Sequence, residues 1–215
     1  MSANFKWNKS NDEIKSDEKD LRVVFFTSRN KDNQNIENFK ERKIAFLAWF
    51  NRYDTPKWVM KKFLNFTREG QKDETSRMYI SVNKRNPQKI KKELAMCLID
   101  DVLGDRHIEV THIESFIAGI AAKTENREES KWLFDFDSFD GIEEFTKDIY
   151  EMSGLLPNLH LTKNGYAVLV DRGFDTRELL KKWPDVGLKK DDLLLVHWAV
   201  NCSNTLQEKK KEVDK

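Results

Sequence analysis

Features that would assign a functional class at once are absent from this chain of 215 residues. Its two cysteines, Cys97 and Cys202, form neither a metal-binding spacing nor a disulfide framework, which favours a reducing compartment. No run of eighteen apolar residues occurs, and the amino end has no apolar core of signal-peptide length. There is also no Gly-x-Ser-x-Gly elbow, P-loop or zinc ribbon. We therefore expect a soluble, cytoplasmic protein that does not enter a membrane.

A strong net charge of either sign is also missing. Charged residues make up 35% of the chain, yet 38 basic and 37 acidic side chains leave a net charge of only +1. Bulk charge therefore excludes a strongly basic nucleic-acid binder, and any nucleic-acid surface has to come from a local basic patch.

Polar and charged ends flank one predicted folded region. Residues 1–20 and 205–215 contain few side chains that can bury surface, so we expect both segments to be flexible. The length of the region 21–204 fits a single globular domain.

Hydrophobic periodicity predicts strands interleaved with helices. Strands are expected at 21–28, 77–85, 131–137, 158–162, 166–171 and 193–201. Helices are expected at 35–53, 56–66, 87–103, 111–123, 141–154 and 176–183. The Asn164-Gly165 turn predicts an antiparallel hairpin, because Asn-Gly accepts positive φ. Together these elements predict an α+β fold in which a mixed β-sheet packs against several helices.

The stretch KWLFDFDSFDG, residues 131–141, contains the most informative pair of residues. In an extended strand, Asp135 and Asp137 lie side by side on the face opposite the aromatic rings. Two carboxylates at this spacing repel each other unless a cation lies between them, and a divalent metal is the commonest such cation. The alternative is turn chemistry, in which Asp-Ser-Phe-Asp-Gly leads from the strand into a helix near Ile142.

The order of three segments resembles the archaeo-eukaryotic primase superfamily, which includes primase-polymerases and shorter relatives in phages and mobile elements. The segments are RMYISVNKR with the helix after it, WLFDFD, and LHLTKNGYAVLV, all within residues 77–171. The resemblance implies a primase-like, RRM-related palm and a metal-dependent nucleotidyltransferase that acts on nucleic acid with nucleoside triphosphates. It implies Asp135 and Asp137 as catalytic ligands of Mg²⁺ or Mn²⁺, which promote phosphoryl transfer.

A third catalytic carboxylate is also implied, and several residues are available for it. The candidates are Asp171, Asp175, Asp191 and Asp192. We take Asp171, because it ends a strand whose partner could lie beside the strand of Asp135.

The family's phosphate-binding histidine has no counterpart, since Ala167 stands at the expected position. Either Lys163 or His160 of the same hairpin takes over this role, or the chain has lost nucleotide transfer. Other basic candidates for phosphate binding are Arg77, Lys84 and Arg85. If transfer is lost, the fold serves as a module that binds nucleic acid or an unknown protein partner, in phage replication or phage–host conflict.

Aromatic and basic residues interleave in ERKIAFLAWFNRYDTPKWVMKKFLNF, residues 41–66. Such a pattern is typical of surfaces that stack the bases and hold the phosphates of a single strand. A helix that packs its aromatic stripe into the core and leaves its lysines in water gives the same pattern. The densest basic group near aromatics, Lys57, Lys61 and Lys62, is the predicted nucleic-acid surface.

Overall fold

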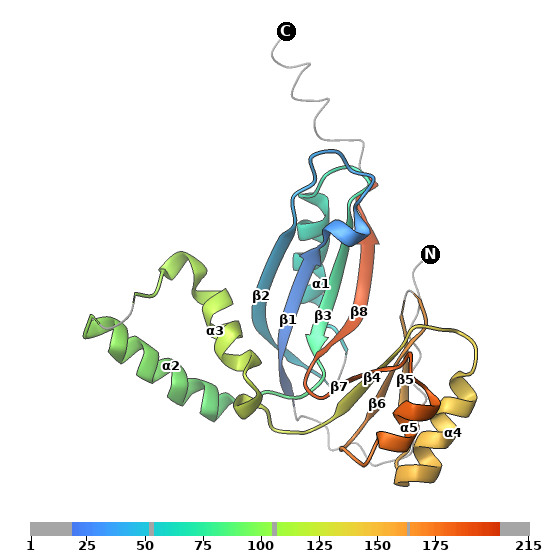
Figure 1. Cartoon of the computed structure of the whole chain (residues 1–215). Coiled ribbons are helices and arrows are strands. Elements are labelled where there is room, and N and C mark those ends of the chain that lie inside the picture. Colours follow the sequence, from blue (N-terminus) through green and yellow to red (C-terminus); the bar gives the residue numbers. More distant parts are fainter. Residues whose placement is uncertain (1–18, 52–53, 105–106, 163, 203–215) are drawn as a thin grey trace.

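A computed structural model describes residues 19–51, 54–104, 107–162 and 164–202, which form two four-stranded sheets and five α-helices (Figure 1). The predicted α+β class is confirmed. The predicted mixed sheet is wrong, because every strand pairing in these residues is antiparallel and the strands divide between two sheets. The predicted flexible segment 205–215 lies outside the described residues, as does most of 1–20, although Asp20 already belongs to a strand.

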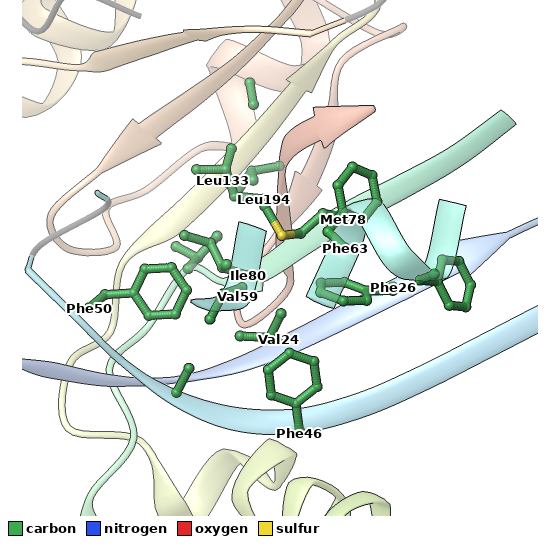
Figure 2. Close-up of a cluster of buried hydrophobic side chains, with 14 of the residues drawn as sticks. Val24, Phe26, Phe46, Phe50, Val59, Phe63, Met78, Ile80, Leu133 and Leu194 are labelled. Atoms are coloured by element: carbon green, nitrogen blue, oxygen red, sulfur yellow. The ribbon is translucent and has the colours of Figure 1, made fainter. Parts of the chain in front are cut away.

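The first sheet has the strand order β2-β1-β3-β8. Its strands are β1 (Asp20–Ser28), β2 (Arg42–Phe50), β3 (Thr75–Ser81) and β8 (Leu193–Val200). Helix α1 (Lys57–Arg68) packs on one face, where Phe26 and Phe46 meet Phe63 in the largest buried cluster (Figure 2). Helix α3 (Ile113–Ala122) covers the other face at β2, and α2 (Pro87–Val102) packs on α3.

The second sheet has the strand order β5-β6-β4-β7. Its strands are β4 (Trp132–Phe136), β5 (Asn158–Leu161), β6 (Tyr166–Val170) and β7 (Gly187–Lys189). Phe134 and Phe136 lie in a buried cluster with residues of helices α4 (Ile142–Ser153) and α5 (Arg177–Lys182). The predicted β5–β6 hairpin is confirmed, and Leu133 points from the opposite face of β4 into the core of the first sheet.

The predicted helix at 35–53 is wrong, because this segment contains strand β2. Strand β2 pairs with β1 along its whole length, from Asp20↔Phe50 to Ser28↔Arg42. Its core-facing side chains lie against α1, and its other face lies against α3, so IAFLAWF reads as a continuous apolar run. Periodicity does not separate a strand buried on both faces from a buried helix. Strand β7 was not predicted, since three residues are too short for a periodic signal.

The remaining predicted elements are confirmed to within a few residues, because local signals set their ends. At α2, the Asn86 side chain accepts hydrogen bonds from the backbone N–H groups of Gln88 and Lys89, and Pro87 occupies the first turn. Gly104, with φ of 84°, follows the last turn. Three short 3-10 helices complete the described elements: Asn30–Asp32, Val110–His112 and Thr124–Asn126. No helix in the described ranges is long and apolar enough to cross a membrane.

Three segments lie side by side where the two sheets meet and form a polar junction: 82–86, 127–131 and 190–192. Asn83 and Lys131 exchange hydrogen bonds through the Asn83 side chain and the Lys131 backbone. The buried Arg85 guanidinium donates two hydrogen bonds to Asp191, at 3.1 and 3.0 Å. Arg22, on β1, reaches the same region and donates to the Ser81 and Val82 carbonyls. The junction thus places several charged groups in the interior.

Candidate nucleic-acid interface

The cation beside Asp135 in the structure is an ammonium group. Asp135 lies in the second sheet, opposite Ala167 of β6 and Gly187 of β7. The Lys189 Nζ atom is 3.1 Å from Asp135 Oδ2 and 3.1 Å from Asp192 Oδ2. The carboxylate that shares a cation with Asp135 is therefore Asp192. Asp137 follows the end of β4 and is exposed.

The charge of Lys189 is stabilised by these two carboxylates. Burial by itself lowers the pKa of Lys189, but the ion pairs with Asp135 and Asp192 outweigh it and raise the pKa above its ordinary value. Lys189 is consequently protonated at neutral pH and neutralises the negative charge that a metal ion would otherwise compensate.

Asp171, the predicted third carboxylate, lies at the opposite end of β4 from Asp135. Val170 pairs with Trp132, whereas Ala167 pairs with Asp135. Asp171 directly follows β6 and is four positions beyond Ala167, and each position adds about 3.3 Å along an extended chain. The ion-pair partner of Asp171 is Lys131, at 3.8 Å. The predicted set of Asp135, Asp137 and Asp171 is therefore not brought together.

The other carboxylates considered for the third position do not complete a metal site either. Asp191 is paired with Arg85, and Asp175 is paired with Arg177. Only Asp192 lies near Asp135, and Lys189 stands between the two. Across the part of the chain that the structure describes, no group of three or more His, Cys, Asp or Glu residues is arranged to hold a metal ion. The donor set therefore does not fit a two-metal centre.

The predicted phosphate ligands on β3 and after it are engaged in ion pairs. The Arg77 guanidinium pairs with Asp32. Arg85 has a side chain that is 3% exposed and pairs with Asp191. Lys84 pairs with Asp20 at 2.9 Å. Each of these cations would have to leave a carboxylate before it could bind a phosphate.

His160 is close in strand register to Asp135 but lacks a positive charge. It lies on β5, opposite Ala167, so His160, Ala167 and Asp135 form one row across three strands. Burial first, and the charge of Lys131 second, lower the pKa of His160 to about 4. The imidazole is therefore neutral at pH 7. Lys163, the alternative ligand in this hairpin, lies outside the described residues.

The three predicted lysines of α1 point to two different sides of the helix. Lys62 lies toward α3: its Nζ atom is 2.8 Å from Glu114 Oε2 and 4.1 Å from the centre of the Phe46 ring. Lys57 and Lys61 instead line a surface hollow of about 380 Å³, here called the α1 hollow. The predicted basic surface is thus divided, and Lys62 belongs to the packing of α1 rather than to the hollow.

The α1 hollow combines free cations with an apolar floor. Its basic residues are Lys57, Lys61 and Arg68, and its apolar residues are Met60 and Leu64. All three cations are exposed, and none of them forms an ion pair with a described residue. Arg68, Met60 and Leu64 were not predicted as part of the surface. Helical spacing from Lys57 and Lys61 places all three on the same face, so this signal was present in the sequence.

The aromatic rings of the 41–66 segment also fall into two groups, one buried and one partly exposed. Phe46, Phe50 and Phe63 are buried in the core and cannot stack on bases. Trp58, the residue after Lys57, is 51% exposed. The interpretation that the helix packs its aromatic stripe into the core is therefore correct for the phenylalanines. The ring of Trp58 is half exposed and contacts the Phe46 ring, 5.6 Å between centres, on the Lys62 side of α1.

Comparison of the chain with protein-family models, with curated proteins and with solved structures finds no match. The function of the chain has to be inferred from its own residues and their arrangement.

Proposed function

We propose that this protein is a module that binds single-stranded nucleic acid through the α1 hollow. The observation that carries the proposal is a set of three exposed cations beside apolar side chains, none of which forms an ion pair within the described part of the chain. Cations without carboxylate partners attract phosphates and release counterions when they bind them. Because the chain as a whole has a net charge of only +1, a local group of this kind is required for any affinity for nucleic acid.

A single strand suits the hollow better than a duplex. Met60 and Leu64 offer apolar surface to the face of an unstacked base. In a duplex these base faces are covered by neighbouring base pairs, so only the phosphate contacts remain. We therefore expect single strands to bind more tightly than duplexes of the same length.

Charge reversal at the hollow tests the proposal. The variant K57E/K61E/R68E should bind a fluorescent single-stranded oligonucleotide at least about tenfold more weakly, measured by anisotropy. Loss of three phosphate contacts should also reduce the salt slope by about 2, at roughly 0.7 per contact. The matched control is K147E/R172E/K181E, which changes net charge equally at exposed positions near or on α4 and α5. Equal weakening in both variants, or in neither, would contradict a site at the hollow.

A second candidate function is the metal-dependent nucleotidyltransferase implied by the resemblance to primases. The pairing of β4 with β6 supports this candidate, because it puts Asp135 next to the position where the resemblance expects a phosphate-binding histidine. In this chain that position is Ala167. The arrangement of Lys189 speaks against it. The test is incorporation of a labelled nucleotide with Mg²⁺ or Mn²⁺ present, in the wild type and in D135N/D137N. Incorporation that requires both carboxylates would favour this candidate, and its absence from the wild type would remove it.

A further inference from the structure

The helices cover one face of the first sheet only in part. Helix α1 packs on the opposite face and contacts β3 and β8 there. Helix α3 covers the face in question at β2 and at part of β1. Figure 1 looks onto this face: α1 lies behind the strands, and α2 and α3 lie to the side of β2. The surface of β1, β3 and β8 is therefore left without a covering helix.

Three aromatic rings from three neighbouring strands lie on this surface. Phe25 pairs directly with Tyr79, and Tyr79 pairs with Leu195 of β8. Trp198 pairs with Arg77, two residues before Tyr79, so the Trp198 ring is a diagonal neighbour of Tyr79. Paired residues, and residues two apart on one strand, share a face of the sheet. We call Phe25, Tyr79, Leu195 and Trp198 the open sheet face.

The rings of the open sheet face lie outside the buried cores. Trp198 is 39% exposed, and Phe25 and Tyr79 are partly exposed. In the described part of the chain, none of the three belongs to a buried hydrophobic cluster or contacts another aromatic ring. By contrast, Phe26, on the α1 side of β1, contacts three other rings. The faces of the outer rings are therefore available to a ligand.

A row of paired residues beside the rings carries cations. It runs across all four strands as Lys43, Thr27, Arg77 and Trp198. Lys43 is exposed and forms no ion pair with any residue that the structure describes. Arg77 shares the carboxylate of Asp32 with a second guanidinium, that of Arg29. This group of three side chains therefore keeps a net positive charge while its ion pairs stay intact.

The carboxylates near this row are fewer than the cations. Glu41 lies two residues before Lys43 in the chain, and the exposed Lys31 offsets its charge. Segment 29–32 together with Glu41, Lys43 and Arg77 contains four cations and two carboxylates. Positive charge is thus in excess at the border of the open sheet face, which attracts a polyanion.

We propose that the open sheet face binds single-stranded nucleic acid, with unpaired bases stacked on its rings and phosphates beside the row of cations. Side chains that are opposite or diagonal on neighbouring strands lie about 5–8 Å apart, so successive bases meet different rings. A duplex covers its base faces, and an apolar protein surface gains nothing from the cations. The inference goes beyond the proposed function, because this face and the α1 hollow lie on opposite sides of the first sheet.

Removal of the rings tests the site. By anisotropy, the wild type should bind a short fluorescent oligothymidylate at least about tenfold more tightly than an abasic strand of the same length. F25L/Y79L/W198L keeps apolar side chains but cannot stack bases, so it should bind oligothymidylate about tenfold or more weakly and lose the preference. The control F139L/Y150L changes two rings near the second sheet, 55% and 52% exposed, and should bind like the wild type.

Two milder variants separate stacking from damage to the fold. F25Y/Y79F/W198F keeps all three rings and should bind within about threefold of the wild type. W198L changes one exposed ring on an edge strand, so it should keep the wild-type thermal midpoint and still weaken binding about fivefold. Wild-type affinity in a folded W198L and a folded F25L/Y79L/W198L would overturn the proposal.

The salt dependence of binding tests the cation row. K43E should reduce the slope of the logarithm of affinity against the logarithm of salt concentration by about 0.7, because one phosphate contact is lost. K147E, at an exposed lysine of α4, changes the net charge equally and should leave the slope unchanged. Equal slopes in K43E and K147E would contradict a phosphate contact at this row.

The K57E/K61E/R68E background separates this site from the α1 hollow. Binding that remains there should still prefer oligothymidylate over the abasic strand, and F25L/Y79L/W198L should remove that preference. If charge reversal at the hollow abolishes all binding, the open sheet face is not a site, while the proposed function stands. If only the ring variant loses binding and the hollow variant does not, the proposed function fails and the open sheet face is the site.

Discussion

The cations at the junction of the two sheets and those of the α1 hollow are the same kinds of side chain in opposite surroundings. Arg22 and Arg85 are almost fully buried, and each forms an ion pair with a carboxylate. Lys57 and Lys61 are exposed, and neither forms an ion pair with any residue that the structure describes. A buried cation cannot leave its partner without a large desolvation cost, whereas an exposed one can exchange water for a ligand. The first pair therefore serves the fold, and the second is available for binding.

Breaking the junction should have the largest effect on stability. R85M leaves the carboxylate of Asp191 buried without its cation, because Asp191 is only 8% exposed. We expect the free energy of unfolding to fall by about 3–5 kcal/mol. Urea denaturation followed by tryptophan fluorescence measures this change.

The double variant R85M/D191L provides the control, since it removes both charges. It should recover most of the loss, because replacing a buried ion pair by apolar residues is often neutral. If R85M alone unfolded at the same urea concentration as the wild type, Arg85 would not hold the junction together, and its role as a phosphate ligand would be open again.

His160 should make the second sheet sensitive to acid. Its pKa in the folded chain, about 4, lies below the ordinary value of 6.5, so the unfolded chain binds a proton first as the pH falls. Stability contributed by neutral His160 is complete above about pH 7 and is lost progressively as the pH drops toward 4. The expected loss between pH 7 and pH 5 is about 2 kcal/mol.

The matching variants are H160Q and H112Q. Urea titrations at pH 7 and pH 5 should show a flatter pH dependence for H160Q than for the wild type. H112Q, at an exposed histidine, should keep the wild-type dependence. Identical pH dependences in all three proteins would contradict the burial of a neutral imidazole at position 160.

Lys189 is intermediate in exposure between the buried arginines of the junction and the exposed lysines of the α1 hollow. Its side chain is 43% exposed, and its partners Asp135 and Asp192 are 36% and 39% exposed. K189A should lower the free energy of unfolding by less than about 1 kcal/mol, because water screens ion pairs at this exposure. A loss as large as that of R85M, measured in the same urea titration, would show that this ion-pair group belongs with the buried junction.

The hollow should show the smallest effect on stability. K57E/K61E/R68E changes only exposed side chains that have no ion-pair partner among the described residues, so its thermal unfolding midpoint should stay close to that of the wild type. Nucleic-acid affinity should nevertheless fall in the same protein. A marked drop in the midpoint, measured by circular dichroism, would mean that these cations support the fold rather than a ligand.

Local signals in the sequence were sufficient for most helices and for the hairpin. Asn86, Pro87 and Gly104 set the ends of α2 through contacts within a few residues. Asn164-Gly165 correctly marked the β5–β6 hairpin, although Gly165 does not have the positive φ on which that prediction rested. The segment 42–50 could not be predicted in the same way. Its strand conformation depends on β1 on one side and on helices over both faces, and none of these contacts is local.

The sequence by itself determined the composition of the candidate sites: two carboxylates at the end of a strand and just after it, and the cations of α1. Only the tertiary structure decided which groups meet. Asp192 rather than Asp171 comes near Asp135, because β7 pairs with β4 and brings Lys189 with it. Arg85 finds Asp191 across 106 residues of chain. Such partners depend on strand register and on the closure of long loops, which the pattern of neighbouring residues does not encode.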